Sequence, residues 1–136
     1  MKLYLKVSSL LLCFVFCTTA HAHEMTPAYP QLKSSYIDGV SSAKMKLFNR
    51  RQDVSYYLIE VFTSDFKPIP FASSSISTVS SKVIKVGYNK SKIFDVYIRS
   101  NDIDRAVYIC TQSKLFKQTD QISLITSRVC SKIKDK

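Results

Sequence analysis

Asp104-Arg105-Ala106-Val107-Tyr108-Ile109-Cys110 is the stretch that decides the fold of this chain, together with Ser127-Arg128-Val129-Cys130. Its pattern predicts a β-strand with Ala106, Tyr108 and Cys110 on one face. The second stretch carries the other cysteine that we expect in the mature protein. If Cys110 and Cys130 pair, they join two late strands across a loop of nineteen intervening residues.

The first twenty-two residues have the pattern of an export signal. Lys2 and Lys6 form a basic start, residues 10–17 form an apolar run, and Ala20-His21-Ala22 is a small-x-small cleavage site. The apolar run is too short to span a bilayer as a stable helix. We therefore expect a signal peptide over residues 1–22 and a periplasmic or secreted protein without stable membrane insertion. An uncleaved anchor is the alternative.

Cleavage after Ala22 would remove Cys13 and Cys17 and leave 114 residues with two cysteines. This length fits one domain with a single core. An exported chain with two cysteines matures in an oxidising compartment, so we expect a Cys110–Cys130 disulfide. Closing a loop of this size would stabilise the fold by about 3 kcal/mol. The alternative is one buried and one free thiol.

The mature sequence consists of short apolar stretches separated by polar turns. Residues 23–30 predict an extended arm, and residues 31–136 predict a single β-sandwich domain. The expected strands are 32–37, 43–47, 55–63, 69–72, 82–86, 93–99, 104–110 and 122–133, the first and fourth of them weak or short. With no helix expected after the signal, the fold class is all-β, an immunoglobulin-like sandwich of about seven strands.

Two details of this pattern can be compared directly with a structure. Residues 55–63 are apolar on both faces, so this strand should lie in the middle of a sheet. The serine-rich stretch 73–81 and the polar stretch 111–121 predict loops. Alternation along 43–47 and 93–99 leaves Lys44 and Lys46 exposed and buries the apolar side chains of Met45, Leu47, Phe94, Val96 and Ile98.

The net charge of +10, or +8 without Lys2 and Lys6, is strongly basic. The basic residues are spread along the chain, which is typical of a solvated surface. Attraction to anionic lipid, polysaccharide or an acidic protein is the alternative. The export signal, rather than the charge, disfavours nucleic acid as a partner.

The sequence offers no catalytic constellation. His23 would be the single histidine after cleavage, so no Ser/His or Cys/His pair is available. Nucleophile elbows, metal-spaced cysteines and His-Glu-x-x-His patterns are absent from the sequence. Asp102 and Asp104 are expected to be solvated turn carboxylates rather than a glycosidase pair. We expect a protein that is not an enzyme and carries no cofactor or metal.

The His21-Ala22-His23 end raises copper binding as a separate hypothesis. After cleavage at Ala22, the amine and imidazole of His23 could bind copper together, as in exported copper-binding sandwiches that begin with histidine. Those proteins supply a further histidine from the fold, and this chain has none to supply.

The stretch Asp104 to Cys110 resembles the sixth-strand signature of immunoglobulin variable domains. In those domains the partner cysteine lies upstream and packs on a tryptophan, whereas here Cys130 lies downstream and the chain has no tryptophan. The closer resemblance is to the N-terminal domain of PapD-like periplasmic pilus and capsule assembly chaperones. A β-hairpin of 45–49 with 57–62 looks like their second and third strands. The stretch 85–89 resembles the turn before their fifth strand, and Asp104-Arg105 the opening of their sixth.

The cysteines are the most specific part of this resemblance. One branch of the chaperones ties its sixth and seventh strands as Cys110 and Cys130 would. In that branch a lysine follows the second cysteine by two residues, as Lys132 does here, and its cationic partner on the first strand would be Lys33. The resemblance implies that these two cations anchor the carboxylate of a pilin-like subunit. The seventh strand, with Ile122 and Leu124, would then complete the subunit's fold by β-augmentation.

The expected function is therefore an exported, non-enzymatic sandwich that binds another protein, acting like a chaperone through a sheet edge. The alternative is a structural or accessory component of a surface or bacteriophage assembly. A fainter resemblance, to uncharacterised exported proteins of marine bacteriophages, rests on residues 46–51 and 104–110 and implies no activity. A secreted copper-binding protein is the third hypothesis.

Overall fold

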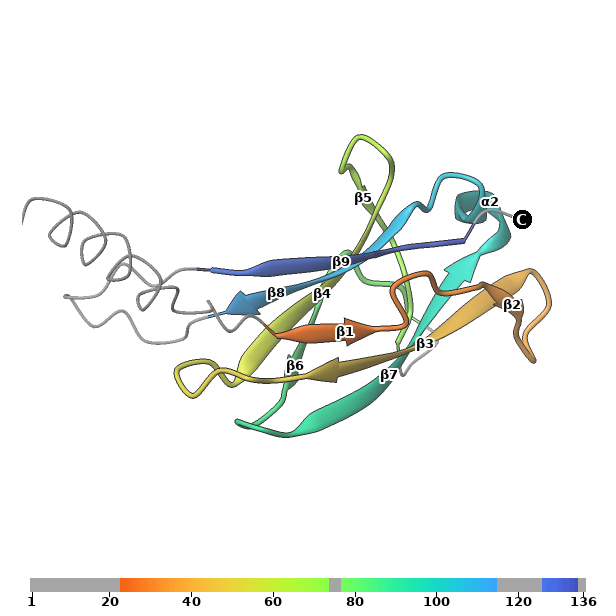
Figure 1. Cartoon of the computed structure of the whole chain (residues 1–136). Helices are drawn as coiled ribbons and strands as arrows, with labels where there is room; N and C mark the ends of the chain where they lie inside the picture. Colours follow the sequence, from red (N-terminus) through yellow and green to blue (C-terminus); the bar gives the residue numbers. More distant parts are fainter. Residues whose placement is uncertain (1–22, 74–76, 115–125, 135–136) are drawn as a thin grey trace, which may run out of the picture.

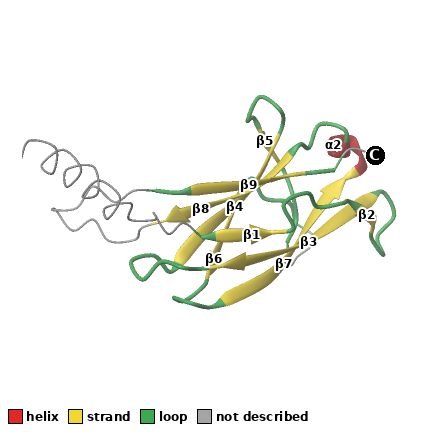
Figure 2. Cartoon of the chain, viewed as in Figure 1, coloured by secondary structure: helices red, strands yellow, loops and turns green. Residues whose placement is uncertain are grey.

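Two antiparallel sheets pack face to face in the computed structural model, which describes residues 23–73, 77–114 and 126–134 (Figures 1 and 2). The first sheet, sheet A, contains β1 (Glu24–Thr26), β2 (Lys33–Ser34), β3 (Val40–Phe48) and β7 (Ser91–Arg99). The second, sheet B, contains β4 (Tyr56–Phe62), β5 (Pro68–Ile69), β6 (Lys82–Lys85), β8 (Tyr108–Lys114) and β9 (Arg128–Lys132). The all-β sandwich is confirmed. None of the helices in the described ranges is long and apolar enough to cross a bilayer.

Strand β3 is the centre of sheet A. It pairs with β7 over its whole length, from Val40 opposite Arg99 to Phe48 opposite Ser91. Strands β1 and β2 both pair with the other side of β3, β1 near its end and β2 near its start. The two short strands therefore form one interrupted first strand. The segment 23–30 contributes β1 to the sheet and bends at residues 28 and 29.

Strand β4 is the centre of sheet B. It pairs with β8 on one side and with both β5 and β6 on the other, and β9 is the edge strand beyond β8. The prediction that residues 55–63 lie in the middle of a sheet is confirmed. This strand order is of the immunoglobulin type. The interrupted strand β1/β2 with β3 and β7 takes the place of the first, second and fifth immunoglobulin strands, and β4, β8 and β9 take the place of the third, sixth and seventh.

The predicted hairpin of 45–49 with 57–62 is wrong. Strand β3 belongs to sheet A and β4 to sheet B, so the connection crosses between sheets. The side chain of Asn49 holds this crossover, because its amide donates to the carbonyls of Val54 at 2.7 Å and Val86 at 2.9 Å. Apolar alternation gives each strand an inward face, and it does not say whether the two strands face each other or pair.

The predicted strand 104–110 begins later and ends later than expected. A helix, α2 (Ser100–Ile103), precedes it, and the amides of Arg105 and Ala106 donate to the carbonyl of Asp102. These bonds continue the helical turn, so the strand starts only at Tyr108. It then runs to Lys114, so the predicted loop 111–121 is wrong in its first four residues. The reason is that Thr111 and Ser113 point inward and find hydrogen-bond partners there.

Several predictions fall outside the described residues. These are the signal peptide over 1–22, the middle of the serine-rich loop at 74–76, residues 115–121 of the polar loop, and Ile122 and Leu124 of the last strand. Within the described part of the chain, the last strand spans Arg128–Lys132 and not the whole of 122–133.

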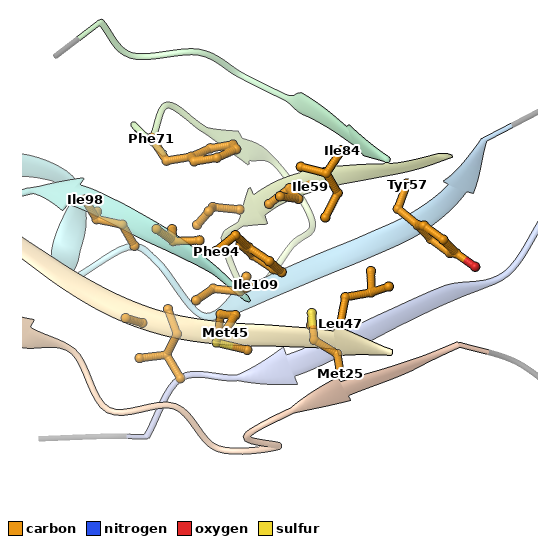
Figure 3. Packing of buried hydrophobic residues seen from close by; sticks show 14 of the residues in the cluster. Met25, Met45, Leu47, Tyr57, Ile59, Phe71, Ile84, Phe94, Ile98 and Ile109 are labelled. Atoms are coloured by element: carbon orange, nitrogen blue, oxygen red, sulfur yellow. The ribbon is translucent and has the colours of Figure 1, made fainter. Parts of the chain in front are cut away.

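The core lies between the two sheets (Figure 3). The five predicted core residues are buried, with exposed fractions of at most 6%. Lys44 and Lys46 point to solvent from the outer face of β3, as predicted. Sheet B contributes, among others, Tyr57, Ile59, Val61 and Ile109, each 0% exposed. Inward side chains of both sheets therefore fill one continuous layer, as expected for sandwiches.

We predict that Val96→Asp unfolds the domain. Val96 is 0% exposed in the middle of β7, and an unpaired charge in this apolar layer costs several kcal/mol, a large part of the stability of a domain this size. Ile93→Asp on the same strand is the control, because Ile93 is 60% exposed. Circular dichroism melting should show a cooperative transition for Ile93→Asp alone. A cooperative melt of Val96→Asp at an unchanged temperature would contradict the core assignment.

Candidate functional site

The disulfide joins the two strands that the sequence singled out. Cys110 and Cys130 lie directly opposite each other in the β8–β9 pairing, with Cα atoms 4.1 Å apart and an S–S bond of 2.03 Å. Cys110 is buried, while Cys130 is exposed on the outer face of sheet B. The bond agrees with maturation in an oxidising, extracytoplasmic compartment.

Exported protein should therefore contain a Cys110–Cys130 cross-link. Peptide mapping without reductant should recover the two cysteines in one linked peptide pair. Replacing both by Ser should lower the free energy of unfolding by about 3 kcal/mol, measured by urea denaturation. Recovery of unlinked Cys110 and Cys130 peptides from protein of an oxidising compartment would contradict the prediction.

The two predicted anchor lysines lie on strands of different sheets. Lys33 pairs with Ser42 in sheet A, and Lys132 pairs with Tyr108 in sheet B. Their neighbours Leu32 and Ile133 face the core, so both lysines project outward, and both are exposed. A nearby pocket of about 220 Å³ is lined by residues next to them and by neither lysine. A shared cationic pocket stays a prediction.

The outer edge of β9 is accompanied by the chain's own first segment. The amide of Lys132 donates to the carbonyl of Ala28 at 3.0 Å, and the amide of Lys134 donates to that of Pro30 at 2.9 Å. Strand β1, just before Ala28, is in contact with β9. A partner strand added at this edge would have to displace residues of the protein itself.

His23 joins the start of the same N-terminal segment to the other end of the β9 edge. Its Nδ1 lies 3.2 Å from Ser127 Oγ, just before β9, and its Nε2 lies 2.8 Å from Thr111 Oγ1 on β8. The ring also packs against Tyr57, with centroids 4.7 Å apart. Because both ring nitrogens are engaged inside the fold, this geometry does not favour copper binding. Among the described residues, no group of three His, Cys, Asp or Glu side chains could hold a metal ion.

A buried polar network surrounds Asn49 and Tyr57. The Tyr57 hydroxyl donates to Asn49 Oδ1, which also accepts from the Arg51 amide at 2.7 Å. Burial raises the pKa of Tyr57 to about 12, so this hydroxyl is protonated at neutral pH. Arg51 forms a bidentate pair with Asp53 and lowers the pKa of that carboxyl. These contacts hold the crossover between the sheets.

Stability should fall as pH drops below the ordinary histidine range. Burial lowers the pKa of His23 below its usual 6.5, and the nearby Arg51 cation lowers it further. The unfolded chain therefore binds more protons below pH 6.5, and stability is lost there with a slope of at most about 1.4 kcal/mol per pH unit. Asp53, whose pKa is lowered from 3.8, contributes a loss only at more acidic pH.

His23→Gln is the matched variant, because glutamine keeps hydrogen-bonding groups and cannot gain this charge. Urea denaturation between about pH 7 and about pH 5 should show a decline for the natural protein and a flatter profile for His23→Gln. Equal slopes in the two proteins would show that another group carries the pH dependence.

In the described part of the chain, β7 has an edge that is only partly paired. Tyr97 exchanges backbone hydrogen bonds with Ala72, on the side of β7 that faces away from β3. Because this direction alternates along an antiparallel strand, the backbone groups of Ile93 and Asp95 point the same way. Among the described residues they have no backbone partner. Within residues 23–73, 77–114 and 126–134, no strand covers the stretch Ser91–Asp95 on this side.

Exposed apolar side chains accompany this edge. Ile93 is 60% exposed, and Val83 on β6 and Tyr88 on the β6–β7 connection are 39% and 51% exposed. Strands β6 and β7 are the edges of their sheets on the same side of the sandwich, opposite β9 and β1. Sequence reasoning placed Ile93 at the start of a strand. It did not find the free edge, because alternation does not say which strands are neighbours.

No family model matches the chain, and no curated protein is similar enough to count as a relative.

Proposed function

We propose that this protein is an exported, non-enzymatic sandwich that binds another protein by adding a strand of that partner to the edge of β7. The backbone groups of Ile93 and Asp95, which have no partner in the part of the chain that the structure describes, carry the proposal, since an extended segment can pair with such an edge. The exposed Ile93 side chain offers an apolar contact on the outer face of the extended sheet.

The surroundings of the edge indicate the chemistry of the partner segment. Lys46 lies opposite Ile93 and Lys44 opposite Asp95 on the neighbouring strand, and both lysines are exposed. With the net charge of +10, these cations favour a partner segment that carries acidic residues.

A PapD-like chaperone is the finer form of this proposal. The two-sheet sandwich and the disulfide between its last two strands support it. The chaperone mechanism would use the last strand, whose outer edge here is accompanied by Ala28 and Pro30. For this reason we favour β7 as the binding edge. A chaperone would be absent from the finished assembly and a structural component would be retained in it, so proteomics of purified surface assemblies separates the two.

The pair Ile93→Pro and Ile93→Ala tests the edge. Proline removes the outward N–H and no bond to β3, whereas alanine removes the same side-chain contact and keeps the N–H. A photo-crosslinking amino acid at Ser91 should yield an adduct with a partner in producing cells. We expect Ile93→Pro to reduce this adduct at least about tenfold and Ile93→Ala to reduce it less, because proline also removes backbone pairing.

The same photo-crosslinker at Tyr29 is the positional control. Tyr29 is 69% exposed and lies beside the outer edge of β9, between Ala28 and Pro30. Both variants should melt cooperatively, since neither loses a bond within the sheet. Adducts formed at Tyr29 and not at Ser91 would overturn the β7 edge and assign binding to β9. Equal adduct yields from Ile93→Pro and Ile93→Ala would show that strand pairing is not the mode of binding.

A further inference from the structure

A second surface of interest lies at the end of β7 beyond the free edge. A pocket there encloses about 680 Å³, within the range of small-molecule sites. Its walls come from the β2–β3 turn, the end of β7, the start of α2, and Ala72, Ser73 and Thr78. The residues that carry its chemistry are Tyr36, Asp38, Asp95, Tyr97, Arg99 and Asn101.

The β2–β3 turn is held in place by its own hydrogen bonds. The amide of Ser35 donates to the Val40 carbonyl at 2.9 Å, and that of Ile37 donates to Ser35 Oγ at 3.0 Å. Gly39 has a φ of 73°, which this turn requires, and its carbonyl accepts from the Ser100 amide at 2.7 Å. The turn is thus tied to both β3 and α2. A ligand would meet a wall that is already formed, which lowers the entropy cost of binding.

Two tyrosines form an aromatic corner in this pocket. Tyr36 is 86% exposed, and its ring meets that of Tyr97 edge-on, with centroids 6.5 Å apart. Partial burial raises the pKa of Tyr97, and the nearby Asp95 carboxylate and Tyr36 raise it further. Exposed aromatic rings beside hydrogen-bonding groups suit a ligand that has apolar faces and a polar rim.

The charges of the pocket narrow the class of ligand. Asp38 and Asp95 supply acceptors, and Arg99 supplies donors, and none of the three has an ion-pair partner among the described residues. Two carboxylates disfavour an anion. Arg99 and the net charge of +10 disfavour a cation. A neutral ligand with many hydroxyl groups can donate to the carboxylates and accept from Arg99 and Asn101.

We infer that this pocket binds a neutral oligosaccharide. One sugar ring lays its C–H face on Tyr36 or Tyr97, and its hydroxyls bind Asp95, Asp38 and Arg99. The pocket meets the proposed strand edge at Asp95, whose carboxylate lines the pocket while its backbone groups belong to the edge. The titration below uses the protein without its partner, so its outcome is independent of strand pairing.

Titrations of isotope-labelled exported protein with cellobiose, maltose and N-acetyllactosamine test the inference. At least one sugar should cause saturable shifts of backbone amides in residues 36–40 and 95–101, with a Kd of about 1 mM or lower. Tyr36→Ala and Asp95→Asn should each weaken that binding at least about tenfold. Tyr88→Ala is the control for loss of an exposed tyrosine and should leave the Kd unchanged.

The absence of saturable amide shifts with all three sugars would overturn the proposal. Sugar binding with the same Kd in Tyr36→Ala and Asp95→Asn would overturn it as well. A parallel titration with tetramethylammonium tests the opposite charge preference, because two tyrosines and two carboxylates could also hold a cation. Saturable binding of tetramethylammonium at these residues without sugar binding would replace the oligosaccharide by a cationic ligand.

Discussion

The bond from the Lys132 amide to the Ala28 carbonyl connects the two sheets along one side of the sandwich. Strands β3 and β4 are the centres of two separate sheets, and no strand of one sheet pairs with a strand of the other in the described residues. Backbone contacts along the sides of the sandwich are therefore what joins the two sheets there. On this side the chain makes two further contacts in the same register, from Lys134 to Pro30 and from His23 to Ser127. The interruption between β1 and β2 follows from this, because residues 28–30 leave β3 to reach β9.

The opposite side is closed over part of its length. Ala72 pairs with Tyr97, and Phe71 pairs with Val79, so the segment after β5 covers the far end of β7. Among the described residues, no strand pairs with the outer side of the near end of β7 or of β6, the corresponding edge strand of sheet B. Exposed lysines next to an edge are a common protection against aggregation, and Lys92 and Lys85 stand there. The exposed Ile93, next to Lys92 in the sequence, is the residue that such protection does not explain.

Sequence alone predicted the features that depend on local pattern or on counting. Alternation gave the inward faces of β3 and β7, continuous apolarity gave the central place of β4, and cysteine counting gave the disulfide. The neighbours of each strand could not be predicted, because inward faces look the same whether two strands pair or face each other. That is why the crossover at Asn49 was taken for a hairpin, and why the edge of β7 was missed.

Polar residues that point inward caused the other error. Thr111, Ser113 and His23 look like loop or arm residues in the sequence, and all three are buried. His23 hydrogen-bonds to Thr111 on β8, and Ser113 on β8 accepts from the amide of Ser127, just before β9. A buried polar group with partners can specify how strands dock as well as stabilise them. Here the network fixes the arm to β8 and β9. Apolar side chains in place of these three residues could fill the same space, and they would not fix the register of the arm against β8 and β9.

The length of the free edge limits what strand pairing can contribute. Ile93 and Asp95 offer two N–H and two C=O groups, and the bond between Ala72 and Tyr97 blocks the next position. Four backbone hydrogen bonds contribute roughly 2 to 6 kcal/mol net. Association alone costs about 4 kcal/mol or more, so pairing at this edge cannot by itself give a stable complex. In the complex that we propose, side-chain contacts, with the exposed Ile93 among them, would have to supply most of the affinity. Under this proposal the side chains of the segment would select the partner, and the backbone of β7 would set only its direction and register.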